Sequence, residues 1–360
     1  MSEIDENVTE LLPERVRNVN LYDPLRKPVT YDLSDNTSQW GMAPGVRDRI
    51  TSLANDPAVH LSRYPEIYGA SVKEQLARNY EEYLGENPLN KIMIGCGTDD
   101  VLDCLIRACT QAGETIINPM PSFPMAGYFA KYNDRNVVGI ELEADGSIDV
   151  DKFLAVPSKL IYLCSPNNPT GLPISRARID DLVNRYEGFI VIDEAYAEFA
   201  HNNCLDLLKK NPRIVILRTF SKLHALAGLR IGYGLGNREV IAAAEALRGP
   251  YKANAIALAA AHDSLTQKTW LSSVIEQVRE QREWFLGELF ELGYAPLASD
   301  VNFVFIPMEV SDQLAQAFER AEIAVRIFDD LALYGSGIRV TIAPREILTK
   351  VLDVLRSEPS

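Results

Sequence analysis

Residues 214–236 read IVILRTFSKLHALAGLRIGYGLG, and this stretch decides the fold class of the chain. Two apolar runs, Ile214–Phe220 and Ile231–Gly236, each predict a buried strand. Lys222 follows the first strand directly and precedes small and apolar residues, so it is poorly placed to be a solvated surface charge. Partial desolvation at such a position lowers the pKa of a lysine and makes its amine a nucleophile toward an aldehyde.

Five further apolar runs lie upstream and alternate with segments of helical period. The expected strands are Lys91–Gly95, Thr115–Pro119, Val137–Leu142, Leu160–Cys164 and Phe189–Asp193. Helices are expected between strands, at Thr98–Thr110, Ile174–Tyr186 and Arg238–Leu247. This alternation predicts an α/β fold whose sheet is covered by helices on both faces.

The pattern changes after a long helical segment at Gln267–Leu292. The segments that follow are expected strands at Asn302–Pro307, Val325–Phe328 and Ile338–Ile342, and expected helices at Ser311–Glu322 and Arg345–Arg356. They are typical of a small α+β domain. We therefore predict an N-terminal arm at residues 1–46 that belongs to the small domain, a large domain at 47–265 and a C-terminal small domain at 266–360.

The composition excludes several classes of protein. The 360 residues carry a formal net charge of −14, and no Lys/Arg cluster offers a footprint for nucleic acid. No apolar run approaches the ~20 residues needed to cross a bilayer, and the polar N-terminus is no signal peptide, so we expect a cytoplasmic protein. The five cysteines lack CxxC spacing and are expected to be reduced, and the four scattered histidines predict no metal site.

Candidate binding residues follow or end several of the expected strands. Gly95–Asp100 (GCGTDD) opens a helix whose N–H groups suit an anion, although it is equally compatible with a simple helix cap. Asp193 ends an apolar strand, so it either caps the next helix or needs a cationic partner. Ser221 and Arg230 offer a hydroxyl and a guanidinium to a phosphate. Together with Lys222, these groups are what pyridoxal 5'-phosphate (PLP) requires.

Three segments carry a family resemblance: SPNNPTG (165–171), DEAY (193–196) and SK…AGLR…G (221–232). From Leu33 to Glu346 the chain resembles the histidinol-phosphate aminotransferase-like branch of the class I/II, fold-type I PLP aminotransferases. The resemblance implies an α/β large domain with a mostly parallel seven-stranded sheet flanked by helices, plus a small α+β domain. It also implies a homodimer and a ping-pong transfer of an amino group to a 2-oxo acid such as 2-oxoglutarate. The implied amino donor is histidinol phosphate, another amino acid or amino-alcohol phosphate, or an aromatic amino acid.

The resemblance assigns roles to individual residues. Three residues are implied to be catalytic: Lys222, which carries the cofactor as a Schiff base and shuttles a proton, Asp193, which binds the pyridine nitrogen, and Tyr196. Asn168 and Tyr196 bond the ring oxygen O3′, and Phe123 stacks on the ring. The phosphate is held by Thr98, Asp99, Ser221, Arg230 and, from a partner subunit, Tyr64. The substrate residues are Arg339, which binds the carboxylate, and Arg326, Tyr22, Asn36 and Asn254.

Departures from the family pattern leave the substrate open. Where the family has Asn-Glu-Asn-Pro, this chain keeps only Asn36, and Lys252 adds a cation to a Pro-Tyr-Asn-Val-Asn-like segment. His224 stands where an aromatic residue is usual, and a packed histidine is favoured over a substrate contact. A PLP-dependent decarboxylase of a phosphorylated amino acid and a non-catalytic relative of the same fold stay open as alternatives.

Overall fold

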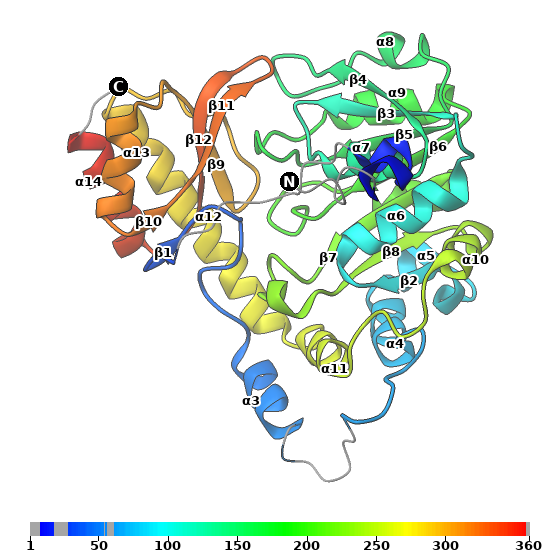
Figure 1. Cartoon of the computed structure of the whole chain (residues 1–360). Helices are drawn as coiled ribbons and strands as arrows, with labels where there is room; N and C mark the ends of the chain where they lie inside the picture. Colours follow the sequence, from blue (N-terminus) through cyan, green and yellow to red (C-terminus); the bar gives the residue numbers. More distant parts are fainter. Residues whose placement is uncertain (1–7, 18–27, 54, 56–60, 358–360) are drawn as a thin grey trace.

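The computed structural model describes residues 8–17, 28–53, 55 and 61–357, and its centre is a seven-stranded sheet (Figure 1). The strand order is β2-β8-β7-β6-β5-β3-β4. Neighbours are parallel except at β8, which is antiparallel to both β2 and β7. The strands are β2 (Ile92–Gly95), β3 (Thr115–Met120), β4 (Asn136–Glu141), β5 (Leu160–Cys164), β6 (Phe189–Asp193), β7 (Ile214–Thr219) and β8 (Gly232–Gly236).

All seven expected strands are therefore present, and the predicted mostly parallel α/β sheet is confirmed. The central strands are apolar along their whole length because both of their faces are buried. In β7, Ile214 and Ile216 pack into one hydrophobic cluster, whereas Val215 and Leu217 pack into another. Alternation within one strand is what a sheet covered on both faces requires.

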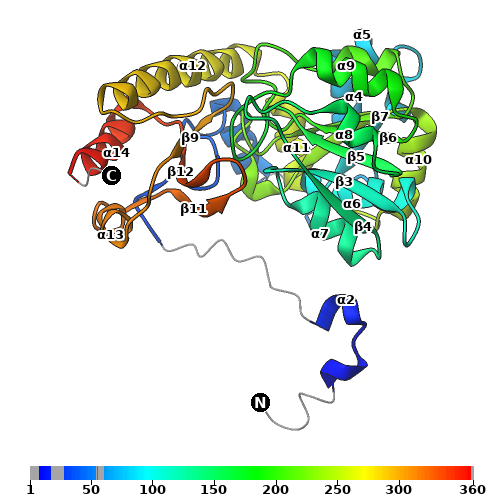
Figure 2. The same ribbon diagram turned by 90° about the horizontal axis from the view of Figure 1, so that it is seen from above.

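Helices cover both faces of the sheet, and Figure 2 shows α9 and α7 on opposite sides of it. One face carries α3 (Pro44–Leu53), α4 (Ala70–Asn79), α8 (Val150–Leu154), α9 (Arg176–Arg185) and α11 (Ala255–Ser264). The other face carries α6 (Gly97–Cys109), α7 (Met125–Tyr132) and α10 (Arg238–Leu247). The shorter elements are α2 (Glu14–Arg17), α5 (Glu81–Leu84), η1 (Pro88–Lys91), η2 (Leu205–Lys209) and η3 (Ala227–Leu229).

A second hydrophobic cluster forms the core of the C-terminal part. The long helix α12 (Lys268–Glu291) leads into β9 (Phe303–Pro307), α13 (Asp312–Arg320), β10 (Ile323–Ala324), β11 (Arg326–Leu331), β12 (Gly335–Thr341) and α14 (Arg345–Ser357). β11, β12 and β9 form an antiparallel sheet, and β1 (Tyr31–Asp32) pairs with β10. Leu33 from the N-terminal segment is buried in the same cluster, so this segment packs with the C-terminal part.

The hairpin of β11 and β12 is longer than the sequence pattern indicated. Pairing continues to Leu331 and Gly335, whereas strands were expected only at Val325–Phe328 and Ile338–Ile342. Asp329 and Asp330 are exposed, so the outer part of the hairpin lacks the apolar run on which the prediction relied.

Two further expectations can be compared with the described residues. All five thiols are free, and four of them are buried. Within the described ranges, the helices lack the combination of length and apolar character that a membrane span needs.

Candidate active site

A cavity of about 780 Å³ lies between the sheet and the C-terminal part. It opens where parallel strands of the large sheet end, which is where α/β folds place ligands. Twelve of the fifteen residues that the sequence singled out line it: Asn36, Thr98, Asp99, Phe123, Asn168, Asp193, Tyr196, Ser221, Lys222, Arg230, Arg326 and Arg339.

Lys222 lies three residues beyond the end of β7 and reaches toward the N-terminal segment. Its Nζ donates a hydrogen bond to the backbone oxygen of Asp35 at 2.8 Å and lies 5.7 Å from the centre of the Tyr196 ring. Desolvation lowers the pKa of Lys222 from 10.5 to about 8. The amine is therefore partly unprotonated near neutral pH, as a nucleophile or a base must be.

Asp193 is a buried carboxylate at the end of β6, with 4% of its surface exposed. Its oxygens accept hydrogen bonds from the Tyr162 hydroxyl at 2.7 Å and from the Ala195 N–H at 3.0 Å. Burial raises the pKa of Asp193 to about 6. In the described part of the chain, no lysine, arginine or histidine forms an ion pair with it, so the cavity holds a carboxylate that calls for a cation.

The interpretation of Asp193 as a simple helix cap is not supported, because a turn rather than a helix follows it. The Ala195 N–H bond closes a local turn, and the second oxygen is engaged by Tyr162 from the neighbouring strand β5. Tyr162 was missed by the sequence analysis. The available signal was a hydroxyl within the otherwise apolar strand LIYLC.

The N-terminal turn of α6 forms a cup with the Arg230 turn. Gly97, at φ +79°, brings the helix start so close to Arg230 that a Cβ there would lie 2.6 Å from the guanidinium. Arg230 pairs with Asp99 at 3.3 Å, and Thr98 lines the same side of the cavity. Gly232 is equally constrained, because a Cβ would lie 2.5 Å from the backbone nitrogen of Thr98. Free N–H groups at a helix start, next to a guanidinium, form a site for an anion such as a phosphate.

Two arginines from the β11–β12 hairpin also line the cavity. Arg339 donates hydrogen bonds to Asn168 and to the backbone oxygen of Ser34, the latter at 2.6 Å. Arg326 is its direct partner across the hairpin and lies 6.0 Å from the centre of the Phe328 ring. In the described part of the chain, no carboxylate pairs with Arg326. A cation in this position suits a second anionic group on a ligand.

Asn36 is buried and in the left-handed region, at φ 58°. Its side chain donates a hydrogen bond to the Tyr196 hydroxyl at 3.1 Å, and its backbone N–H donates to Thr341 at 3.0 Å. Asn36 therefore holds Tyr196 in place as well as lining the cavity.

Two of the predicted residues that the structure describes, Tyr64 and Asn254, are not part of this cavity. Tyr64 and Asn254 line a second, surface pocket of about 720 Å³, where Tyr64 stacks on Tyr251 at 4.4 Å between ring centres. Asn254 caps α11 through the Ala257 N–H at 2.8 Å. Tyr22 lies outside the described residues. His224 is packed as expected, since it is buried and its Nδ1 lies 2.7 Å from the Ser264 hydroxyl.

The chain is similar to known proteins along nearly its whole length. Residues 34–355 match the family profile described as aminotransferase class I and II. A histidinol-phosphate aminotransferase of Citrifermentans bemidjiense is 32% identical over 96% of this chain and 97% of the relative. A histidinol-phosphate aminotransferase of a Geobacter species is 32% identical over 99% and 98% of the two chains.

Solved structures give the same picture. The histidinol-phosphate aminotransferase of Sinorhizobium meliloti in complex with pyridoxal-5'-phosphate superposes with a TM-score of 0.84, at 26% identity over 96% of this chain and 98% of that one. The L-threonine-O-3-phosphate decarboxylase of Porphyromonas gingivalis has a TM-score of 0.78 at 20% identity, covering 91% and 98% of the two chains. The latter likeness shows the shared fold only.

Proposed function

Since the chain belongs to the class I and II aminotransferases and is a PLP-dependent enzyme, we propose that it moves the amino group of a phosphorylated amino alcohol of the histidinol-phosphate type to a 2-oxo acid such as 2-oxoglutarate. The observation that carries this proposal is that Lys222 and Asp193 line the same cavity. Lys222 supplies an amine of lowered pKa, and Asp193 supplies a buried carboxylate that lacks a cation in the described part of the chain.

The residues present fit PLP. Asp193 suits a protonated pyridine nitrogen, because that cation would relieve the cost of burying the carboxylate. The backbone N–H groups of Thr98 and Asp99 at the start of α6, together with the Arg230 guanidinium, suit the phosphate. Phe123 lines the same cavity, and the family resemblance implies that it stacks on the ring.

The chemistry divides between the cofactor and the chain. When bound, PLP supplies an aldehyde that takes up amines and a protonated ring that withdraws electrons from the substrate Cα. With PLP bound, Lys222 would hold it through Nζ, and the same Nζ, when not bonded to the cofactor, would be the base for the substrate Cα proton. Asp193 would keep a proton on the pyridine nitrogen. Asn36 orients the Tyr196 hydroxyl toward this site through its 3.1 Å hydrogen bond.

The proposed substrate class rests on Arg326 and Arg339. Arg326 and Arg339 present two guanidinium groups from adjacent strands, and such groups bind a phosphate through paired hydrogen bonds. The names of the similar proteins favour histidinol phosphate as the phosphorylated donor.

We further propose that two copies of the chain associate and that Tyr64 reaches the cofactor phosphate of the partner subunit. Tyr64 is 81% exposed and lies outside the cavity of its own chain, which supports a role across an interface. Sedimentation of the PLP-loaded protein tests the proposal: a dimer is expected, and a stable monomer with full occupancy would contradict it. The cytoplasmic location stays a prediction.

The reaction is tested by half-reactions on the PLP-loaded protein. Histidinol phosphate, glutamate, aspartate and the aromatic amino acids are added singly while the cofactor absorbance is followed and products are identified. Loss of the band with formation of the matching oxo compound from histidinol phosphate is expected. Release of CO₂ from glutamate, aspartate or an aromatic amino acid would establish a decarboxylase, since histidinol phosphate has no carboxyl group to lose. No response to histidinol phosphate would overturn the proposed substrate class.

A further inference from the structure

We propose that Lys252 is a positioning residue for the cofactor phosphate, because it neutralises the Asp100 carboxylate in the first turn of α6. This inference deepens the proposed function, since it takes the start of α6 as the phosphate site. Lys252 is also the cation by which this chain departs from the Pro-Tyr-Asn-Val-Asn pattern.

Groups of opposite electrostatic effect lie together in the first turn of α6. The helix start attracts anions through its free N–H groups, but it also carries two carboxylates, Asp99 and Asp100. A phosphate bound there would be repelled by both of them. Both carboxylates form an ion pair: Arg230 lies 3.3 Å from Asp99, and Lys252 lies 3.0 Å from Asp100.

Asp100 cannot turn away to relieve this repulsion. One of its oxygens accepts the backbone N–H of Cys96, the N-cap residue of α6, at 3.0 Å. Its side chain is only 8% exposed, so water screens the charge poorly. Gly95 lies directly against it, since a Cβ at that position would be 3.0 Å from the carboxylate. Asp100 is therefore a fixed negative charge one residue beyond Asp99, which lines the cavity, and Lys252 compensates it.

The loop that presents Lys252 is itself fixed to the phosphate cup. Tyr251, in the left-handed region at φ 55°, stacks on Tyr64. Asn254 donates a hydrogen bond to the backbone oxygen of Leu229, the residue before Arg230, at 3.3 Å. The same short loop thus contacts the Asp100 turn, the Arg230 turn and the segment of Tyr64. These contacts fix the position of Lys252 relative to Arg230, the other cation at the start of α6.

The test compares PLP binding by the full-length chain and its variants, measured by titration of the cofactor-free protein. Lys252→Met keeps the length of the side chain and removes the charge, and we expect PLP binding to weaken about five-fold, the scale of one partly exposed ion pair. Lys252→Arg should retain the wild-type affinity. Pyridoxal, which lacks the phosphate, should bind the wild type and Lys252→Met equally well.

The double variant Lys252→Met/Asp100→Asn separates charge balance from a merely structural role. Asparagine keeps an oxygen for the Cys96 N–H while removing the negative charge. If Lys252 acts by neutralising Asp100, the double variant recovers most of the affinity that Lys252→Met loses. If Lys252 only holds the loop, the double variant binds as weakly as the single one, and the proposal is overturned.

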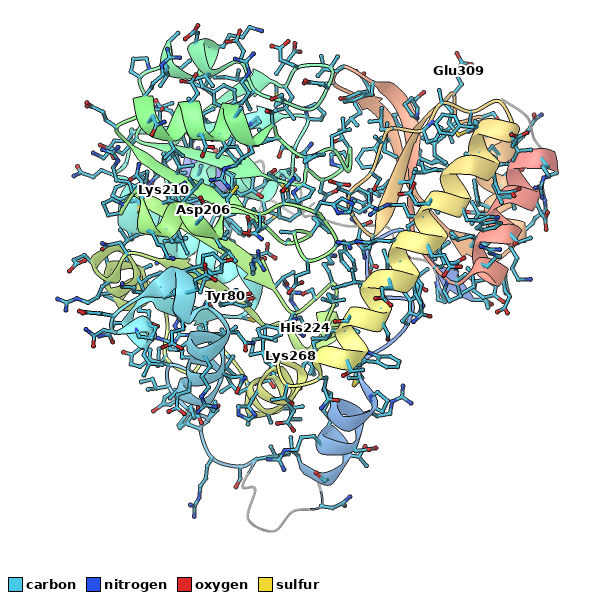
Figure 3. All side chains as sticks on the ribbon, turned by 180° about the vertical axis from the view of Figure 1, so that it is seen from behind. Tyr80, Asp206, Lys210, His224, Lys268 and Glu309 are labelled. Carbon is cyan, nitrogen blue, oxygen red and sulfur yellow. The ribbon has the colours of Figure 1, made fainter. Side chains whose placement is uncertain are left out.

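A control pair lies at η2: Asp206 belongs to this element, Lys210 follows it directly, and the two pair at 2.7 Å without lining the cavity. Both are labelled in Figure 3. Lys210→Met should leave PLP binding unchanged. Thermal unfolding of each cofactor-free variant verifies that it is folded. Unchanged PLP binding by Lys252→Met would overturn this inference alone, whereas a wild-type chain that binds no PLP would overturn the proposed function as well.

Discussion

Arg326 and Arg339 are direct partners across the β11–β12 hairpin, and both line the cavity that contains Lys222. Their guanidinium carbons lie 6.0 and 5.9 Å from the centre of the same ring, that of Phe328. Like charges on directly opposed strand positions are unfavourable unless another group compensates them. An anionic group of the substrate between them would provide that compensation.

Replacement of Arg326 by Met is expected to lower kcat/KM for a phosphorylated amine by about 10²-fold, the scale of a lost charged hydrogen bond at a site with few other partners. For an amino acid with a single carboxylate, the same change should have little effect, because Arg339 is retained. Steady-state kinetics with both substrate classes verifies this. Equal losses for both would show that Arg326 supports the fold of the hairpin rather than binding the substrate phosphate.

Replacement of Lys222 by Ala is expected to lower turnover by at least about 10³-fold, because both the nucleophile and the base are lost. The variant should still fold and bind PLP, since the other residues of the cavity stay in place. Lys222→Arg keeps the positive charge and serves as the control, and it should be equally inactive. Mass spectrometry after borohydride reduction should detect covalent cofactor only in the wild type. Near-normal turnover of either variant would refute the role of Lys222.

Asp193 should leave a signature in the pH dependence of stability. Its pKa is raised to about 6 in the folded chain, above the ordinary 3.8, so the folded state binds the proton more tightly between these values. Its contribution to stability is therefore present below about pH 4 and is lost as the pH rises through 6. In cofactor-free protein, Asp193→Asn should gain about 1–3 kcal/mol relative to the wild type between pH 4 and pH 7.

Urea unfolding at several pH values measures this difference between the two proteins. With PLP added at pH 7, the wild type should become more stable than Asp193→Asn, because only the ionised carboxylate of the wild type pairs with the pyridine nitrogen. If the free energies of unfolding of the wild type and Asp193→Asn differ by the same amount at every pH, the raised pKa of Asp193 is contradicted.

Gly97 and Gly113 form a matched pair for testing the phosphate cup. Both have positive φ, +79° and +81°, so alanine at either position should cost roughly 1–2 kcal/mol of stability. Only at Gly97 would the new Cβ also meet Arg230, whereas nothing lies within 4 Å of it at Gly113. PLP titration and thermal unfolding of both variants should therefore show similar destabilisation, but weaker cofactor binding for Gly97→Ala alone. Equal PLP affinities would mean that Arg230 adjusts freely.

The strands of the large sheet could be predicted because local sequence and tertiary burial agree there. Leu160–Cys164 is apolar apart from the Tyr162 hydroxyl, Phe189–Asp193 is apolar up to its final Asp193, and both faces of these strands are buried. The outer half of the β11–β12 hairpin could not be predicted in this way. It carries the exposed Asp329 and Asp330 in place of an apolar run, and its strands are defined by pairing with each other.

The sequence by itself determined the fold class and the chemistry, because Lys222 and Asp193 follow or end strands whose apolar character fixes them at one edge of a parallel sheet. Only the tertiary structure decided the contacts that hold and balance these groups. The Lys222 amine bonds to Asp35 over a separation of 187 residues, Asn36 bonds to Tyr196 over 160, and Lys252 pairs with Asp100 over 152. Periodicity and strand-end motifs report which face or edge a residue occupies, but not which distant segment packs against it. Hydrogen bonds and ion pairs between such segments are set by packing, and packing is decided only when the whole chain has folded.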